Sequence, residues 1–275
     1  INRDNPTPLL GEMESTNPCG EQPLLPYEPC NLGSINLSRM LRTSGAGWEI
    51  AWDKLERTVR IAVHFLDNVI DASRYPLDLI DRMAKGNRKI GLGVMGFADM
   101  LIRLGVPYDS EEALRTGEGV MQFIRERGRE ASANLAIERG LFPNYAGSVY
   151  ERSGGPRLRN ATITTVAPTG TLSIIAGCSS GIEPLYALAY TRHVLGGIDL
   201  PEVNAAFLET ARTRGFYSDA MLMRLTAGER LATMNETPED VKRTFVTTFD
   251  IAPEWHVRMQ AAFQRHTDNA VSKTI

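Results

Sequence analysis

Hydrophobic residues recur at helical spacing between residues 52 and 72. Apolar side chains stand three or four positions apart, and polar ones fill the opposite face; the apolar set is Leu55, Val59, Ala62, Val63, Leu66, Val69 and Ile70. This period predicts an amphipathic helix that buries one face. A second helix is predicted after Asp109-Ser-Glu-Glu112, which resembles a capping box, with Gly140 where a C-terminal cap belongs. Thr237-Pro-Glu-Asp240 predicts a helix with proline at its first position, and another helix is predicted from Pro253.

Short apolar and β-branched runs predict strands between these helices. Residues 30–37 suit a buried strand that enters a short helix, and residues 88–94 suit a short buried strand. Residues 161–166 are β-branched and lead into a Pro-Thr-Gly-Thr loop. Residues 1–29 hold many prolines and glycines and are expected to form loops. Because strands and helices alternate, we predict an α/β fold with a mainly parallel sheet.

Composition restricts the class of protein. The chain has 275 residues, of which 43% are hydrophobic and 23% charged, enough for one large domain with a core. The net charge of −3 is spread evenly, so we expect neither a nucleic-acid-binding stripe nor a polybasic membrane patch. There is no apolar run of about 18 residues and no signal-peptide pattern. Three cysteines without a C-x-x-C pair argue against a disulfide scaffold and a zinc site, and a reducing cytoplasm fits best.

The segment Asn17-Pro-Cys-Gly-Glu21 is the strongest candidate for chemistry. If it is extended, Asn17, Cys19 and Glu21 point the same way, because side chains alternate along an extended chain. They would then bring together an amide, a sulfur suited to nucleophilic or radical work, and a proton-accepting carboxylate. A second thiol, Cys30, follows eleven residues later. An isolated cysteine in a loop is usually a small half-buried residue, so the longer context has to decide.

Two glycine-containing loops have alternative interpretations. Gly91-Leu-Gly-Val-Met-Gly96 spells G-x-G-x-x-G after a predicted strand, as dinucleotide-binding loops do. No acidic residue ends a next strand at the required spacing, so we expect close helix-to-strand packing to explain these glycines. The loop after residues 161–166 could bind an anion through backbone N–H groups if a helix follows, or could be an ordinary turn. Its residues are Pro168, Thr169, Gly170, Thr171, Leu172 and Ser173.

These motifs occur in an order that resembles one enzyme family. Asn17-Pro-Cys-Gly-Glu-Gln-Pro-Leu-Leu-Pro26, Asn31-Leu-Gly-Ser-Ile-Asn-Leu37, Ala167-Pro-Thr-Gly-Thr-Leu-Ser-Ile-Ile-Ala-Gly177 and Ser180-Gly-Ile-Glu-Pro184 follow one another. Together they resemble the catalytic subunit of ribonucleotide reductase, most closely its adenosylcobalamin-dependent (class II) branch. The resemblance extends from Ile1 to Ile275.

The resemblance implies a fold and a place within it. The family's catalytic subunit is a ten-stranded α/β barrel of two five-stranded halves, with a finger loop through its centre that carries the radical cysteine. Residues of about 12–27 would be the finger loop, and residues 28–275 the second half-barrel. The first half-barrel and the C-terminal tail would lie outside this chain, which we therefore expect to be an internal piece of a longer polypeptide.

The resemblance also implies residue roles. Cys19 would carry the thiyl radical that takes the 3′-hydrogen of the ribose, Glu21 would be the base on the 3′-hydroxyl, and Asn17 would hydrogen-bond the ribose hydroxyls. Cys30 would be one of two cysteines that deliver reducing equivalents and end as a disulfide, its partner lying upstream of Ile1. The loop of residues 168–173 would bind the substrate phosphates.

The activity implied is the reduction of a ribonucleotide, in the form of a diphosphate, to a deoxyribonucleotide. The resemblance further implies adenosylcobalamin as cofactor, a dithiol reductant such as thioredoxin, and a homodimer of the full-length protein. Two alternatives stay open: the metal-radical class I large subunit, which shares the triad, and a non-catalytic half-barrel that only completes a partner. His64, His193, His256 and His266 show no ligand spacing, so no metal site is predicted.

Overall fold

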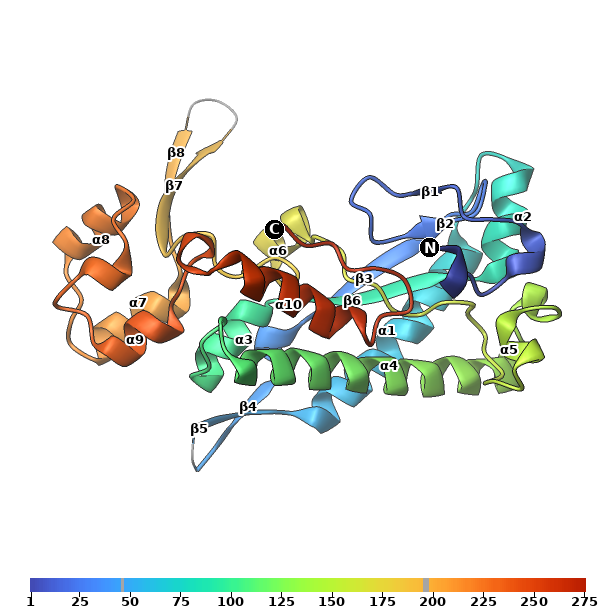
Figure 1. Cartoon of the computed structure of the whole chain (residues 1–275), viewed down its shortest axis with the longest axis horizontal. Helices are drawn as coiled ribbons and strands as arrows, with labels where there is room; N and C mark the ends of the chain where they lie inside the picture. The colour runs from blue at the N-terminus through green and yellow to red at the C-terminus, as the bar shows by residue number, and fades with distance from the viewer. Residues whose placement is uncertain (46, 195–197) are drawn as a thin grey trace.

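The structure is a computed structural model that describes residues 1–45, 47–194 and 198–275 (Figure 1). Residue 46 and residues 195–197, which fall inside the predicted half-barrel, lie outside the described residues. The helices are α1 Trp52–Ala72, α2 Asp78–Asn87, α3 Phe97–Leu104, α4 Glu111–Arg139, α5 Val149–Arg152, α6 Gly170–Ala176, α7 Ala205–Thr213, α8 Asp219–Thr226, α9 Glu239–Thr244 and α10 Pro253–Gln264. The strands are β1 Ser15–Thr16, β2 Pro23–Leu24, β3 Asn31–Asn36, β4 Leu41–Ser44, β5 Gly47–Ile50, β6 Ile90–Met95, β7 Ala189–Val194 and β8 Ile198–Val203.

Parallel extended segments form the centre of the molecule, as predicted. β3 pairs with β6 in parallel register from Asn31–Ile90 to Asn36–Met95. On the other side of β6, residues 162–166 run parallel through a bridge between Leu92 and Thr164, and residues 269–272 follow through a bridge between Val166 and Val271. The predicted strand at 161–166 is therefore an extended segment held by isolated bridges rather than a regular strand.

β6 is buried along its whole length, whereas β3 is not. The prediction of a buried strand at residues 30–37 is thus only partly right. Leu32 is 41% exposed, and within the described residues β3 has β6 as its only neighbouring strand. An edge strand of this kind presents unpaired backbone groups on its open side.

The long helices α1 and α4 pack together and against this centre (Figure 1). α1 spans the predicted residues 52–72 and buries Val59, Val63 and Leu66 in the main core. α4 begins after Ser110, whose hydroxyl accepts a hydrogen bond from the N–H of Ala113 at 3.1 Å. The helix thus begins within the predicted segment, but its cap is Ser110 instead of Asp109, the first residue of that segment. The reciprocal half of a capping box is not formed, because alanine occupies the third helical position.

Helices α7, α8 and α9 build a second, smaller core. α7, α8 and α9 lie together at the left of Figure 1, beside the β7–β8 hairpin. This core is formed by buried apolar side chains that include Leu185, Phe207, Met221, Leu225, Met234, Val241 and Phe245. α10 starts at Pro253 as predicted, whereas Pro238 caps α9 instead of occupying its first turn. No helix within the described residues combines the length and the apolar composition that crossing a membrane requires.

The glycines of β6 are explained by close packing, although the packing partner differs from the prediction. A Cβ on Gly93 would lie 2.1 Å from the carbonyl oxygen of Thr165, so the neighbour is the extended segment and not a helix. Gly96 has φ +71 before α3, and a Cβ there would lie 2.6 Å from Asn36 Oδ1. Glycine allows both the close approach and the positive φ.

Candidate active site

The predicted triad lies at the tip of a hairpin. β1 and β2 pair antiparallel, Thr16 opposite Pro23, and residues 17–22 connect them. The N–H of Gly20 donates to the carbonyl of Asn17 at 3.0 Å, and the N–H of Gln22 donates to Asn17 Oδ1 at 3.0 Å. The segment is therefore a tight turn and not extended. The expectation that three alternate side chains point one way because the chain is extended is wrong.

The turn gives the side chains of Cys19 and Glu21 different surroundings. Cys19 is exposed at the tip, whereas Glu21 is only 1% exposed. The carbonyl of Glu21 accepts hydrogen bonds from the N–H of Ala270 at 3.0 Å and from the Thr165 hydroxyl at 2.8 Å. Its carboxylate oxygen Oε2 is buried and has no hydrogen-bond partner among the described residues. An unpaired buried carboxylate oxygen is costly in a structural role but is available to accept a proton.

The hairpin rests directly on β6. A Cβ on Gly91 would lie 2.5 Å from the side-chain nitrogen of Gln22, so the missing side chain makes room for the residue that follows Glu21. Gln22 is itself 2% exposed. The glycines of the pattern that resembles a dinucleotide loop thus leave room for the hairpin and for the neighbouring extended segment.

Cys30 lies immediately before β3 and is half-buried. Its thiol donates to the carbonyl of Asn31 at 3.3 Å. Removal from water raises the pKa of this thiol well above its ordinary value; the positive charge of Lys89 opposes the shift, and the carboxylates of Glu28 and Glu21 add to it. The influence of Glu21 on Cys30 means that the base and the second thiol of the predicted site share one electrostatic environment.

The structure contains a buried ion pair beside Cys30 that was not predicted from the sequence. Lys89 Nζ lies 2.7 Å from Glu28 Oε2, and both side chains are fully buried. Glu28 also accepts from the N–H of Leu25 at 2.9 Å and from Asn87 Nδ2 at 2.5 Å. The signal was a lysine inside a segment predicted to be buried, since a buried charge requires a partner of opposite charge. Nothing in the sequence indicates which carboxylate that partner is.

The predicted phosphate loop does lead into a helix, α6. Thr169 adopts φ +58 before it, and its hydroxyl accepts from the N–H of Gly181 at 2.8 Å. The Ser173 hydroxyl lies 2.9 Å from that of Ser180. Thr169 and Ser173 are therefore engaged within the protein, whereas Gly170, Thr171 and Leu172 are exposed and Pro168 is half-buried.

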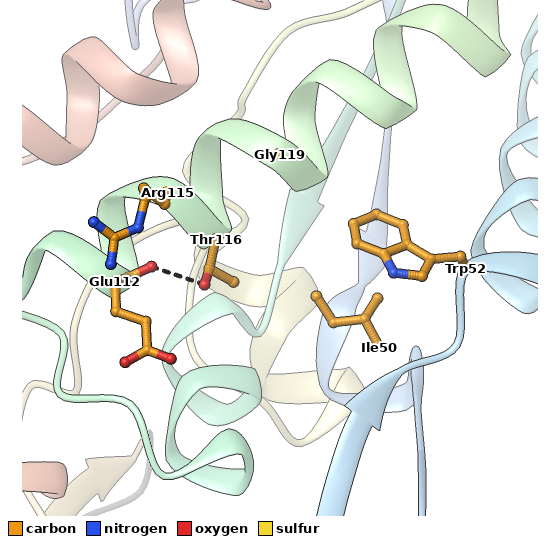
Figure 2. A pocket seen from close by; sticks show the side chains of 6 residues that line it. All are labelled: Ile50, Trp52, Glu112, Arg115, Thr116 and Gly119. Carbon is orange, nitrogen blue, oxygen red and sulfur yellow. Dashed lines mark hydrogen bonds between the residues drawn. The ribbon is translucent and has the colours of Figure 1, made fainter.

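A surface cavity of about 330 Å³ lies elsewhere, between β5, the start of α1 and the first turns of α4 (Figure 2). Ile50 and Trp52 form one side of it, and Glu112, Arg115, Thr116 and Gly119 the other. The Thr116 hydroxyl donates to the carbonyl of Glu112 at 2.8 Å. None of these residues belongs to the predicted site, so the cavity gives no support to that site.

The histidines for which side chains are described have ordinary partners. His64 Nε2 lies 2.7 Å from Arg139 Nη2, as expected for a hydrogen-bonded residue on α1, and His256 Nδ1 lies 2.9 Å from Lys273 Nζ. The side chain of His193 lies outside the described part. Within that part, no group of three or more His, Cys, Asp or Glu side chains is arranged to hold a metal ion.

Comparison with known proteins identifies the family of this chain. It matches the family described as "Ribonucleotide reductase, barrel domain" through residues 1–157 and 152–275. This chain belongs to the ribonucleotide reductase barrel-domain family. The barrel domain is 54% identical to a vitamin B12-dependent ribonucleoside-diphosphate reductase of Thermoplasma acidophilum and 52% identical to one of Mycobacterium tuberculosis, each over 275 residues. It spans 35% and 39% of the length of these relatives.

A solved structure agrees with the fold. The alpha subunit of the class Id ribonucleotide reductase of Actinobacillus ureae superposes with a TM-score of 0.74 over 94% of this chain and 46% of the other, at 21% identity. This likeness concerns the fold alone. The parallel segments and their covering helices are part of an α/β barrel, as predicted, while the division into a finger loop at 12–27 and a half-barrel at 28–275 stays a prediction.

Proposed function

We propose that the protein containing this barrel domain reduces ribonucleotides to deoxyribonucleotides by radical chemistry. The arrangement of Cys19, Glu21 and Cys30 is the observation that carries this proposal. An exposed thiol lies at the hairpin tip, an unpaired buried carboxylate lies two residues on, and a second thiol lies within the electrostatic reach of that carboxylate.

Each residue then has a defined task. The thiyl radical of Cys19 takes the hydrogen from C3′, and Glu21 accepts the proton of the 3′-hydroxyl. The amide of Asn17 contacts the ribose hydroxyls; because its Oδ1 accepts from Gln22, its NH₂ group is the part that donates. The 2′-hydroxyl leaves as water, and Cys30 with a second thiol supplies two electrons and two protons and becomes a disulfide.

The source of the radical does not follow from these residues, but the names of the relatives favour one cofactor. The proteins that are 52–54% identical are named vitamin B12-dependent, which favours adenosylcobalamin over the metal-radical system of class I. When bound, adenosylcobalamin supplies the radical that removes the hydrogen atom of the Cys19 thiol. The exposure of Cys19 fits this, because a cofactor held outside the hairpin can reach the sulfur.

The remaining assignments belong to the same proposal. The substrate is a ribonucleoside diphosphate, and the exposed backbone at Gly170 and Thr171 binds its phosphates. An external dithiol such as thioredoxin returns the disulfide to thiols, and the full-length protein forms a homodimer and acts in the cytoplasm. The alternative of a half-barrel without catalytic residues is disfavoured, because Asn17, Cys19 and Glu21 are all present.

The test compares three serine variants of the full-length protein. Cys19→Ser should abolish exchange of tritium at C3′, because a hydroxyl O–H bond is too strong to serve as the radical site. Cys30→Ser should retain this exchange, then fail for lack of two reducing equivalents and release free base. Cys178→Ser, on a half-exposed cysteine outside the site, is the matched control and should keep turnover. Turnover by Cys19→Ser would refute the mechanism, and loss of exchange in a folded Cys30→Ser would make Cys30 structural.

A further inference from the structure

The buried pair of Glu28 and Lys89 lies beside Cys30 through the geometry of the sheet. In the parallel register Asn31 is opposite Ile90, so Cys30 and Lys89 occupy corresponding positions immediately before β3 and β6. Glu28 precedes Cys30 by two residues. The chain thus brings one positive and one negative charge to a single half-buried thiol.

Several hydrogen bonds hold Glu28 in place. Glu28 accepts from Lys89, from the N–H of Leu25 and from Asn87, and Asn87 Nδ2 also lies 3.2 Å from the Thr7 hydroxyl. Neither charged side chain reaches solvent. Salt therefore screens this pair little, and a change in either charge acts on its neighbours at the low effective dielectric of the interior.

We propose that the buried Glu28–Lys89 pair controls the reactivity of the Cys30 thiol. The charged groups that face Cys30 are Lys89, Glu28 and Glu21; Lys89 favours the thiolate, and the two carboxylates favour the thiol. With the pair intact, the charges of Lys89 and Glu28 largely cancel and desolvation keeps Cys30 protonated. Lys89 and Glu28 are positioning residues that act through Cys30, and the redox meaning of this control rests on the proposed function.

The effect of each charge on Cys30 can be measured separately, because the two charges shift its pKa in opposite directions. Glu28→Gln leaves Lys89 alone and should lower the pKa of Cys30, whereas Lys89→Met leaves Glu28 alone and should raise it. The double variant Glu28→Gln/Lys89→Met removes both charges. It differs from Glu28→Gln only by the lysine, which makes these two a matched pair.

The experiment measures alkylation of Cys30 by iodoacetamide, in which the thiolate sulfur displaces iodide, between pH 7 and 10 in the full-length variants. Digestion after glutamate separates Cys19 from Cys30, because Glu21 lies between them, and mass spectrometry then gives the rate for each thiol. Cys178 serves as the internal reference. At pH 8 we expect Cys30 in Glu28→Gln to react about 10-fold faster than in the double variant. Lys89→Met should react more slowly than the double variant.

A purely structural role gives a different result. Loosening of the loop by an uncompensated buried charge would raise the rate in both single variants above that of the double variant, which leaves neither charge unpaired. Faster reaction of Cys30 in Lys89→Met than in the double variant, or equal rates in Glu28→Gln and the double variant, would overturn the proposal. If Lys89→Met does not fold, equal rates in the matched pair still overturn it. The readout does not depend on ribonucleotide reduction, so a failure here and a failure of the proposed function are distinguishable.

Discussion

Replacing Gly93 with alanine tests whether the glycines of β6 serve packing. The added Cβ would lie 2.1 Å from the carbonyl oxygen of Thr165 and 3.1 Å from the Cα of Val166. Both atoms belong to backbone, so no side-chain rotation relieves the contact. The extended segment must move by more than about 1 Å to lengthen this 2.1 Å contact to an ordinary van der Waals distance of 3.4 Å.

The expected cost follows from what that movement disturbs. Overpacking in a core costs about 1–3 kcal/mol. The displaced segment also carries the hydrogen bond from the N–H of Thr165 to the carbonyl of Leu92 at 3.1 Å, and weakening it adds to the cost. We therefore expect a loss at the upper end, about 3 kcal/mol, which lowers the folding equilibrium constant by roughly two orders of magnitude.

Urea unfolding of the full-length protein, followed by far-ultraviolet circular dichroism, measures this loss as a shift of the midpoint. Gly119→Ala is the matched control, because Gly119 lies within α4 and nothing approaches the position of its Cβ within 4 Å (Figure 2). Alanine there should stabilise by about 0.5–1 kcal/mol. Equal midpoints for the two variants would refute the packing explanation. If the protein bound NAD or FAD tightly and Gly93→Ala abolished this binding, the dinucleotide-binding interpretation would be supported.

Two further predictions concern the chain as a whole. The isolated chain should not reduce ribonucleotides. It should also self-associate in sedimentation velocity, because among the described residues β3 has a neighbouring strand on one side only and Ile175 is 78% exposed. Steady turnover by a monomer would contradict this prediction. Burial and the charge of Lys273 lower the pKa of His256 below 6.5, so the unfolded state binds the proton more readily and stability should fall as the pH drops below about 6.5. Urea midpoints at pH 8 and pH 5 should converge in His256→Gln but not in the control His64→Gln, and an unchanged pH dependence in His256→Gln would rule His256 out as its cause.

The periodic elements could be predicted because their pattern is local. The apolar stripe at 52–72 became α1, and the apolar run near residue 90 became β6, buried throughout. The turn at 17–21 could not be predicted from alternation, because the side chain of Asn17 bonds the backbone of Gln22 and closes the segment. The side chain of an asparagine can hydrogen-bond a nearby backbone group, and this local bond competes with the backbone pairing of an extended strand.

The parts of the site that escaped prediction depend on contacts between distant segments. Lys89 pairs with Glu28 across 61 residues, and Thr165 bonds the carbonyl of Glu21 across 144. A sequence pattern records what each residue is and not which distant residue it meets. The triad and Cys30 could be predicted as site residues because their family motifs are contiguous, and this assignment stays a prediction. The groups that contact them are scattered along the chain.

The hairpin that carries Cys19 is secured by the other end of the chain. Ala270 donates to the carbonyl of Glu21, and Asp268 anchors the same terminal segment by accepting from the N–H groups of Ile163 and Thr164. During synthesis the hairpin emerges from the ribosome first and residues 268–270 come last of these partners. A nascent chain halted before Asp268 would therefore carry both thiols with the turn unsecured. Cys19 therefore reaches its folded position only after Ala270 has been translated.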